Sequence, residues 1–151
     1  MISYKILTPQ TLKKQYLESK KIFEIGIDMN KKVVIVEDDQ LLGIVLEKMA
    51  NSLDLEVLDI SQTGSGAVES IQKHNPDLIF MDIQLADDVN GIQAMQQIRN
   101  HSNAPVIYIT GQSDLNTRKQ ASQVQNSFFM IKPVNIHDLK SAINGIEMPT
   151  A

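Results

Sequence analysis

Cysteine is absent from the 151 residues of this chain, and this absence excludes two kinds of structure. No disulfide framework can form, and no metal site can be built from thiolate ligands. The sequence also lacks an apolar run long enough to span a membrane, and its first residues lack the apolar core of a signal peptide. We therefore expect a cytoplasmic protein without membrane insertion.

Glycine is sparse, with 7 residues, and no glycine-rich loop of the kind that cradles phosphate follows an apolar run. This argues against a free-standing nucleotide-binding domain. No internal repeat or low-complexity segment is present. With 42% hydrophobic residues in 151, the chain can build one ordinary core but not two full domains.

The net charge of −4 is unevenly distributed along the chain. Residues 1 to 32 contain seven Lys against three acidic residues, which gives +4, whereas the remainder contains seven basic and fifteen acidic residues, which gives −8. An acidic body argues against nonspecific binding to nucleic acid. We expect no direct nucleic-acid partner.

Residues 1–31 are expected to form an N-terminal extension that is partly helical. Thr8 followed by Pro9 is a typical helix start, because the hydroxyl can cap the first turn and the proline loses no hydrogen bond there. The apolar residues that follow at roughly helical spacing are Leu12, Tyr16 and Phe23. Either this helix packs on its own domain or stays a loosely ordered leader, or it forms a contact with a partner or a homodimer.

Short apolar runs alternate with segments of helical periodicity through the rest of the chain. The expected strands lie at residues 33–36, 55–60, 78–81, 106–109 and 127–131, the second of them marked by Leu55, Val57 and Ile60, and a helical segment follows each strand. Five strands alternating with five helices predict a parallel sheet with helices on both faces, joined by right-handed crossovers. In the helix after Asp114, we expect Leu115, Ala121 and Val124 to face inward.

Four of these apolar runs end in polar residues that carry chemistry. We call them the polar strand ends: Glu37 and Asp38 after the first run, Asp82 after the third, Thr110 after the fourth and Lys132 after the fifth. Because the carboxyl ends of parallel strands meet at one edge of a sheet, these side chains are expected to lie together. Carboxylates brought so close oppose folding unless a cation lies among them, and oxygen ligands without His or Cys favour Mg²⁺.

The polar strand ends, in this order, resemble the receiver domain of two-component response regulators, in its chemotaxis-type single-domain form. The resemblance places a receiver domain at residues 32–148. It implies a flavodoxin-like, doubly wound sheet of five parallel strands in the order 2-1-3-4-5, with five helices.

The resemblance also implies roles for single residues. Asp82 would be the phosphoacceptor, and Lys132 would neutralise charge on the phosphoryl group. Mg²⁺ would bind directly to Asp38, Asp82 and the backbone carbonyl of Gln84, with Glu37 acting largely through water. The family's Lys-Pro pair, here Lys132-Pro133, usually has a cis peptide bond.

Four residues take further roles from the resemblance. Thr110 would be the switch hydroxyl and Phe129 the switch aromatic, although an ordinary core aromatic is an equal alternative for Phe129. Gln84 and Gln112 stand where side chains tune the lifetime of the phosphoryl group. Since neither offers a carboxylate base, we expect slow self-dephosphorylation.

These observations favour a single-domain response regulator of a phosphorelay, not an enzyme beyond its own phosphotransfer. Its phosphoryl donor would be a sensor histidine kinase or a histidine phosphotransfer protein, and its target an unknown protein, because the receiver is expected to fill the chain to its end. The alternative is a phosphorylation-independent interaction module. A haloacid dehalogenase phosphatase also uses an Asp with Mg²⁺, but it needs Asp-x-Asp after its first strand, whereas Asp82 follows the third.

Overall fold

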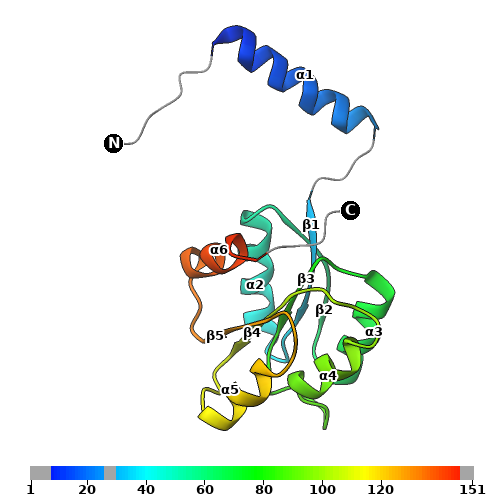
Figure 1. The fold of residues 1–151 in the computed structure, drawn as a ribbon, viewed down its shortest axis with the longest axis vertical. Coiled ribbons are helices and arrows are strands. Elements are labelled where there is room, and N and C mark those ends of the chain that lie inside the picture. Colours follow the sequence, from blue (N-terminus) through cyan, green and yellow to red (C-terminus); the bar gives the residue numbers. More distant parts are fainter. Residues whose placement is uncertain (1–7, 26–29, 147–151) are drawn as a thin grey trace.

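The computed structural model of the chain describes residues 8–25 and 30–146, and in these residues it contains five strands and six helices (Figure 1). The strands are β1 (Lys31–Val36), β2 (Leu55–Ser61), β3 (Leu78–Met81), β4 (Val106–Thr110) and β5 (Ser127–Ile131). The helices are α1 (Pro9–Ile25), α2 (Gln40–Ser52), α3 (Gly64–His74), α4 (Gly91–Ile98), α5 (Leu115–Ser122) and α6 (Ile136–Asn144).

All five strands run parallel in one sheet, in the order β2-β1-β3-β4-β5. This confirms the predicted fold and strand order. The inner strands β3 and β4 are buried along their whole length, because helices cover both faces of the sheet. Their unbroken apolar sequences, LIFM and VIYI, are typical of strands in that position.

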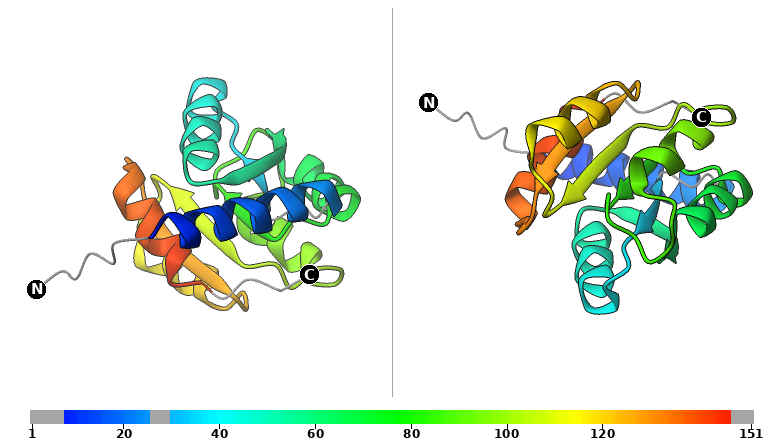
Figure 2. Two further views of the ribbon diagram at one scale, coloured as in Figure 1. Left: turned by 90° about the horizontal axis from the view of Figure 1, so that it is seen from above. Right: turned by 90° about the horizontal axis from the view of Figure 1, so that it is seen from below.

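The sheet separates two hydrophobic cores. On one face, α3, α4 and α5 pack on strand residues such as Val34, Ile79 and Tyr108. On the other face, α2 and α6 pack on residues such as Ile35 and Phe80. Figure 2 shows the same three layers from the two ends of the molecule. Together the two cores fix the strands, and hence the positions of the residues at the strand ends.

Each helix of the layered domain begins at a polar residue whose side chain accepts a hydrogen bond from the first turn. These caps are Asp39 for α2, Thr63 for α3, Asn90 for α4, Asp114 for α5 and Asn135 for α6. Such caps satisfy backbone N–H groups that have no partner within the helix. They therefore define where each loop at this edge of the sheet ends.

The prediction that Leu115 of α5 faces inward is wrong. Ala121 and Val124 are buried, but the side chain of Leu115 is 85% exposed. Since each helical residue turns the chain by about 100°, residues six apart differ by about 120° in direction and cannot share one face. Leu115 therefore points to solvent when Ala121 faces the sheet.

Helix α1 lies apart from the layers in Figure 1, and every side chain from Thr8 to Lys21 is exposed. The exposed apolar residues of this segment are Leu12, Tyr16 and Leu17. Across residues 8–25 and 30–146, none of the helices combines the length and the apolar character needed to cross a membrane.

Replacing Gly91 by alanine is expected to destabilise the fold by about 1–3 kcal/mol or more, because the chain folds back tightly at this residue. A Cβ atom there would lie 2.0 Å from the carbonyl oxygen of Asp82 and 2.9 Å from Cγ of Met81. Gly111→Ala is the matched control, since no described atom lies within 4 Å of its Cβ position. Urea unfolding of both variants tests this, and equal stabilities would contradict it.

Candidate functional site

Four neighbouring strand ends bring polar side chains to one edge of the sheet. Glu37 follows β1, Asp82 follows β3, Thr110 is the last residue of β4, and Lys132 follows β5. Because the strands are parallel and hydrogen-bonded in the order given above, these ends are neighbours in space. The structure therefore brings the predicted strand ends to one edge of the sheet.

The ammonium group of Lys132 lies between two buried carboxylates. Its Nζ donates a hydrogen bond of 2.7 Å to Oδ2 of Asp82 and lies 2.6 Å from Oε1 of Glu37. The side chain of Glu37 is 1% exposed and that of Asp82 is 7% exposed, whereas Lys132 keeps 23% of its side-chain surface. The second oxygen of Asp82, Oδ1, accepts a hydrogen bond of 2.7 Å from the backbone N–H of Ile83.

The positive charge of Lys132 does not fully offset the effects that raise the pKa of Glu37. Burial raises the pKa of Glu37 to about 7, and the neighbouring charge of Asp82 raises it as well, although Lys132 opposes both effects. Burial alone would lower the pKa of Lys132, but its bonds to Asp82 and Glu37 outweigh burial and raise it. One ammonium is therefore shared between two carboxylates.

A third carboxylate, that of Asp38, joins this group. Oxygen atoms of Glu37, Asp38 and Asp82 all lie within 4.8 Å of one another, and Asp38 is exposed to solvent. Oε1 of Glu37 is buried and has the ammonium of Lys132 as its partner at 2.6 Å. Three clustered carboxylates that share one ammonium fit a hard divalent cation with oxygen ligands.

Thr110 brings a hydroxyl to the same edge. Its side chain is buried, and its Oγ1 accepts a hydrogen bond of 3.2 Å from the backbone N–H of Gln112. The hydroxyl proton therefore remains available to a second acceptor. Between the two residues, Gly111 is exposed, and the space where its side chain would stand is open among the described atoms.

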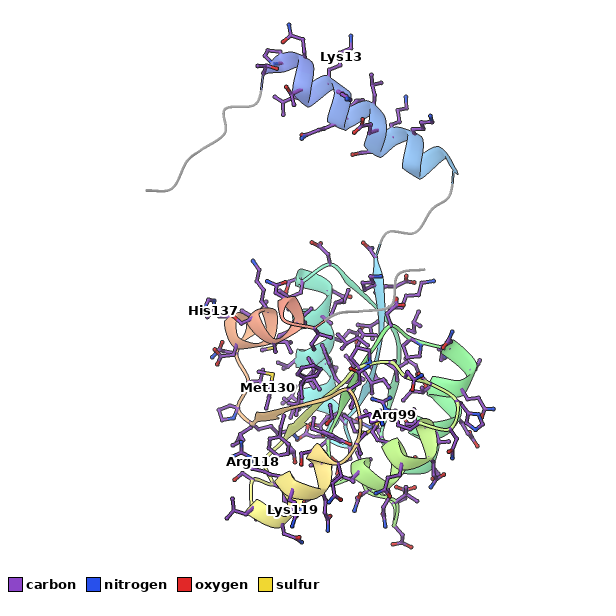
Figure 3. The ribbon with its side chains drawn as sticks, in the orientation of Figure 1. Lys13, Arg99, Arg118, Lys119, Met130 and His137 are labelled. Atoms are coloured by element: carbon purple, nitrogen blue, oxygen red, sulfur yellow. The ribbon has the colours of Figure 1, made fainter. Side chains whose placement is uncertain are left out.

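Phe129 lies one strand pair away, in register with Tyr108 of β4. Its ring is partly buried against the core under α3, α4 and α5, and the guanidinium of Arg118 lies 5.3 Å from the ring centroid. Figure 3 labels Arg118 on α5, on the side of the domain where β5 forms the edge of the sheet. The ring of Phe129 thus packs against the core on one side and is covered by the side chain of Arg118 on the other.

Two features of the site were missed by sequence reasoning. Tyr108 sits within an apolar run, and its buried hydroxyl has no hydrogen-bond partner among the described residues; burial raises its pKa. Asp87 lies in the loop after β3, and its carboxylate contacts Gly64 and Ser65 at the start of α3. An acidic residue in a loop gives no sequence signal for a partner more than twenty positions away.

An apolar groove opens beside Lys132, between α2 and the segment that follows β5. It is lined by Leu42, Val45, Leu46, Met49, Ile109, Lys132, Pro133 and Val134. The Lys132–Pro133 peptide bond is cis. Near the groove, α2 also exposes Leu41 and Ile44 to solvent. A surface of this kind next to a charged site is typical of a protein contact.

Comparison with known proteins agrees with this geometry. Transcriptional regulatory protein KdpE of Staphylococcus aureus is 31% identical over 119 residues, covering 79% of this chain and 51% of that protein. Transcriptional regulatory protein PdtaR of Mycobacterium tuberculosis is 30% identical over 113 residues, covering 75% of this chain and 55% of that protein. The chain thus spans about half the length of these curated relatives.

A solved structure has the same fold. The receiver domain of sensor histidine kinase PA1611 from Pseudomonas aeruginosa, with a magnesium ion coordinated in its active-site cleft, matches with a TM-score of 0.67 and 27% identity, covering 76% of this chain and 95% of that one. A family model for the response regulator receiver domain matches residues 33–144, which include all five strands except the first two residues of β1. The chain therefore belongs to the response regulator receiver domain family.

Proposed function

We propose that this chain accepts a phosphoryl group on Asp82 in a Mg²⁺-dependent reaction and then signals through protein contact. The donor would be a sensor histidine kinase or a histidine phosphotransfer protein. One observation carries the proposal: the ammonium of Lys132 lies 2.7 Å from Asp82, at the edge of the sheet where β4 ends with Thr110. No catalysis beyond this phosphotransfer and a slow self-dephosphorylation is proposed.

The proposed reaction is a displacement at phosphorus. A carboxylate oxygen of Asp82 attacks the phosphorus of a phosphohistidine, the new O–P bond forms, and the P–N bond to the imidazole breaks. The electron pair of that bond leaves with the imidazole, which is protonated, and Asp82 becomes an acyl phosphate. Such transfers depend mainly on positioning and on neutralising charge on the phosphoryl oxygens.

Three groups of this chain would do that work. The bond from the N–H of Ile83 holds Oδ1 of Asp82 and so fixes the direction of the carboxylate. The ammonium of Lys132, which now bonds to Oδ2, would move to a phosphoryl oxygen as the acyl phosphate forms. The hydroxyl of Thr110 would donate its free proton to another phosphoryl oxygen, in the space left open by Gly111.

The acidic group would hold the metal. Asp38, Asp82 and the backbone carbonyl of Gln84 would bind Mg²⁺ directly, and Glu37 would act largely through water. When bound, Mg²⁺ supplies positive charge to the phosphoryl oxygens. The closeness of the three carboxylates and the raised pKa of Glu37 support a cation at this place.

The surface beside Lys132 supports a protein donor. A donor helix carrying a histidine could lay apolar side chains in the groove between α2 and Pro133–Val134, which would bring the histidine toward Asp82. On the output side, bonding of Thr110 to the phosphoryl group would pull on the loop before α5. Phe129 and Arg118 lie on that face and would change position with it.

Incubation with acetyl phosphate and Mg²⁺ is expected to add one phosphoryl group to the intact protein, as measured by mass spectrometry. The Asp82→Asn variant and a sample with chelated metal should show no adduct, because the nucleophile or the metal is then missing. No adduct on the wild-type protein, under conditions that modify a known receiver, would contradict the proposal and favour a phosphorylation-independent interaction module.

The acyl phosphate is expected to decay slowly, because neither Gln84 nor Gln112 offers a carboxylate base to an attacking water. The side chain of Gln84 is exposed and that of Gln112 is partly exposed. After removal of the donor, the loss of the mass adduct with time gives the lifetime. A lifetime of seconds would contradict this expectation.

Replacing Lys132 by methionine is expected to destabilise the metal-free protein and to make its stability depend more strongly on Mg²⁺. Removing one member of a fully buried ion pair costs about 3–5 kcal/mol, and the cost here should be smaller since Lys132 is partly exposed. Thermal unfolding with and without Mg²⁺ measures both effects.

The control for this variant is Lys140→Met, which removes the same charge from an exposed position on α6. It should leave both the melting temperature and its response to Mg²⁺ close to those of the wild type. Equal behaviour of the two variants would show that Lys132 does not balance the carboxylates.

A further inference from the structure

The loop between β3 and α4, residues 83–90, is held against the first turn of α3 by one carboxylate. Oδ1 of Asp87 accepts a hydrogen bond of 2.8 Å from the backbone N–H of Gly64, and Oδ2 accepts one of 3.1 Å from the N–H of Ser65. The hydroxyl of Ser65 donates a further bond to Oδ2. These bonds lower the pKa of Asp87 to about 2, the hydroxyl of Ser65 contributing most, so the carboxylate is charged at neutral pH.

The first turn of α3 needs this partner. Its own cap, Thr63, accepts a hydrogen bond from the N–H of Gly66. The N–H groups of Gly64 and Ser65 are also at the open start of the helix, where no carbonyl of the helix can reach them. Asp87 satisfies both from a distance of more than twenty residues along the chain.

Two other contacts bring the same loop onto α3. The carbonyl oxygen of Val89 lies so close to Gly64 that a Cβ atom on Gly64 would be 2.1 Å from it. The N–H of Ala86 points to the carbonyl of Gln62 at 3.4 Å. The outer part of the loop is therefore fastened to the connection between β2 and α3, and any other residue at position 64 would push the loop away.

The fastened loop is the one that carries Gln84. At its base, the N–H of Gly91 bonds to the carbonyl of Ile83 at 2.8 Å, directly after Asp82. The connection to which it is fastened is itself tied to the site, because the carbonyl of Ser61 accepts a hydrogen bond of 2.8 Å from the N–H of Glu37. The connections that follow β1, β2 and β3 thus form one connected unit, and Asp87 joins the last two of them.

We propose that Asp87 is a positioning residue for the metal site: its bonds to Gly64 and Ser65 keep the loop of residues 83–90 in the shape in which the backbone carbonyl of Gln84 would bind Mg²⁺ together with Asp38 and Asp82. This inference rests on the proposed Mg²⁺ site. Asp87 does not belong to the group of carboxylates that lie within 4.8 Å of one another, so it acts through the loop and not as a ligand.

The test compares Mg²⁺ binding by the intact wild-type protein, Asp87→Asn and Asp88→Asn, using isothermal titration calorimetry. Asp88 is exposed in the same loop, so its variant removes the same charge without touching the bonds to α3. In Asp87→Asn, an amide NH₂ faces an N–H group that needs an acceptor. We expect its Mg²⁺ dissociation constant to rise about tenfold, the low end for partners that orient metal ligands, and that of Asp88→Asn to stay close to the wild-type value.

A melting temperature measured without metal separates positioning from simple capping of α3. If Asp87→Asn melts lower but binds Mg²⁺ as tightly as Asp88→Asn, Asp87 only stabilises the helix and the inference is wrong. Ser65→Ala, which removes one of the three bonds, gives a second test should Asp87→Asn fail to fold, and it should weaken Mg²⁺ binding by a smaller factor. If the wild-type protein itself binds no Mg²⁺, the proposed function fails, and this inference fails with it.

Discussion

The contact of one ammonium with two buried carboxylates is the interaction on which the rest of this edge of the sheet depends. Glu37 and Asp82 would repel each other strongly in a region that water barely reaches, and Lys132 lies between them at 2.6 Å and 2.7 Å. The compensation is incomplete, because Asp38 adds a third negative charge and the pKa of Glu37 remains raised. The protein therefore keeps an acidic edge at the place of the proposed Mg²⁺ site.

The free energy gained by packing the two hydrophobic cores offsets the repulsion between these carboxylates. Strand β3 is apolar over its full length, β4 over the residues before Thr110, and β1 over its last four residues, so their positions are fixed by packing and not by the charged residues that follow them. Helix caps then end each loop at a defined residue, such as Asp39 or Asn90. The charged groups are placed by the fold, and their mutual repulsion is a cost that the apolar packing offsets.

Much of this could be predicted from the sequence, and the reason lies in local patterns. An apolar run such as LIFM followed by Asp82 predicts both a buried strand and a polar group at its end, since parallel strands share their polar edge. What could not be predicted depends on directions and on distant partners: Leu115 points outward because of the turn angle of α5, and Asp87 finds Ser65 through the path of two loops.

The register of β4 with β5 has one more consequence. The sequence contains no tryptophan and three tyrosines, and Tyr108 is fully buried beside Phe129, two residues before Thr110. Its phenol has no hydrogen-bond partner among the described residues, so its ultraviolet absorption and emission depend on how closely the surrounding side chains pack. The exposed Tyr16 on α1 offers a contrasting signal from outside the layered domain. Tyr108 is thus an intrinsic optical probe close to the proposed switch residues Thr110 and Phe129. Rearrangement there can be followed without a label.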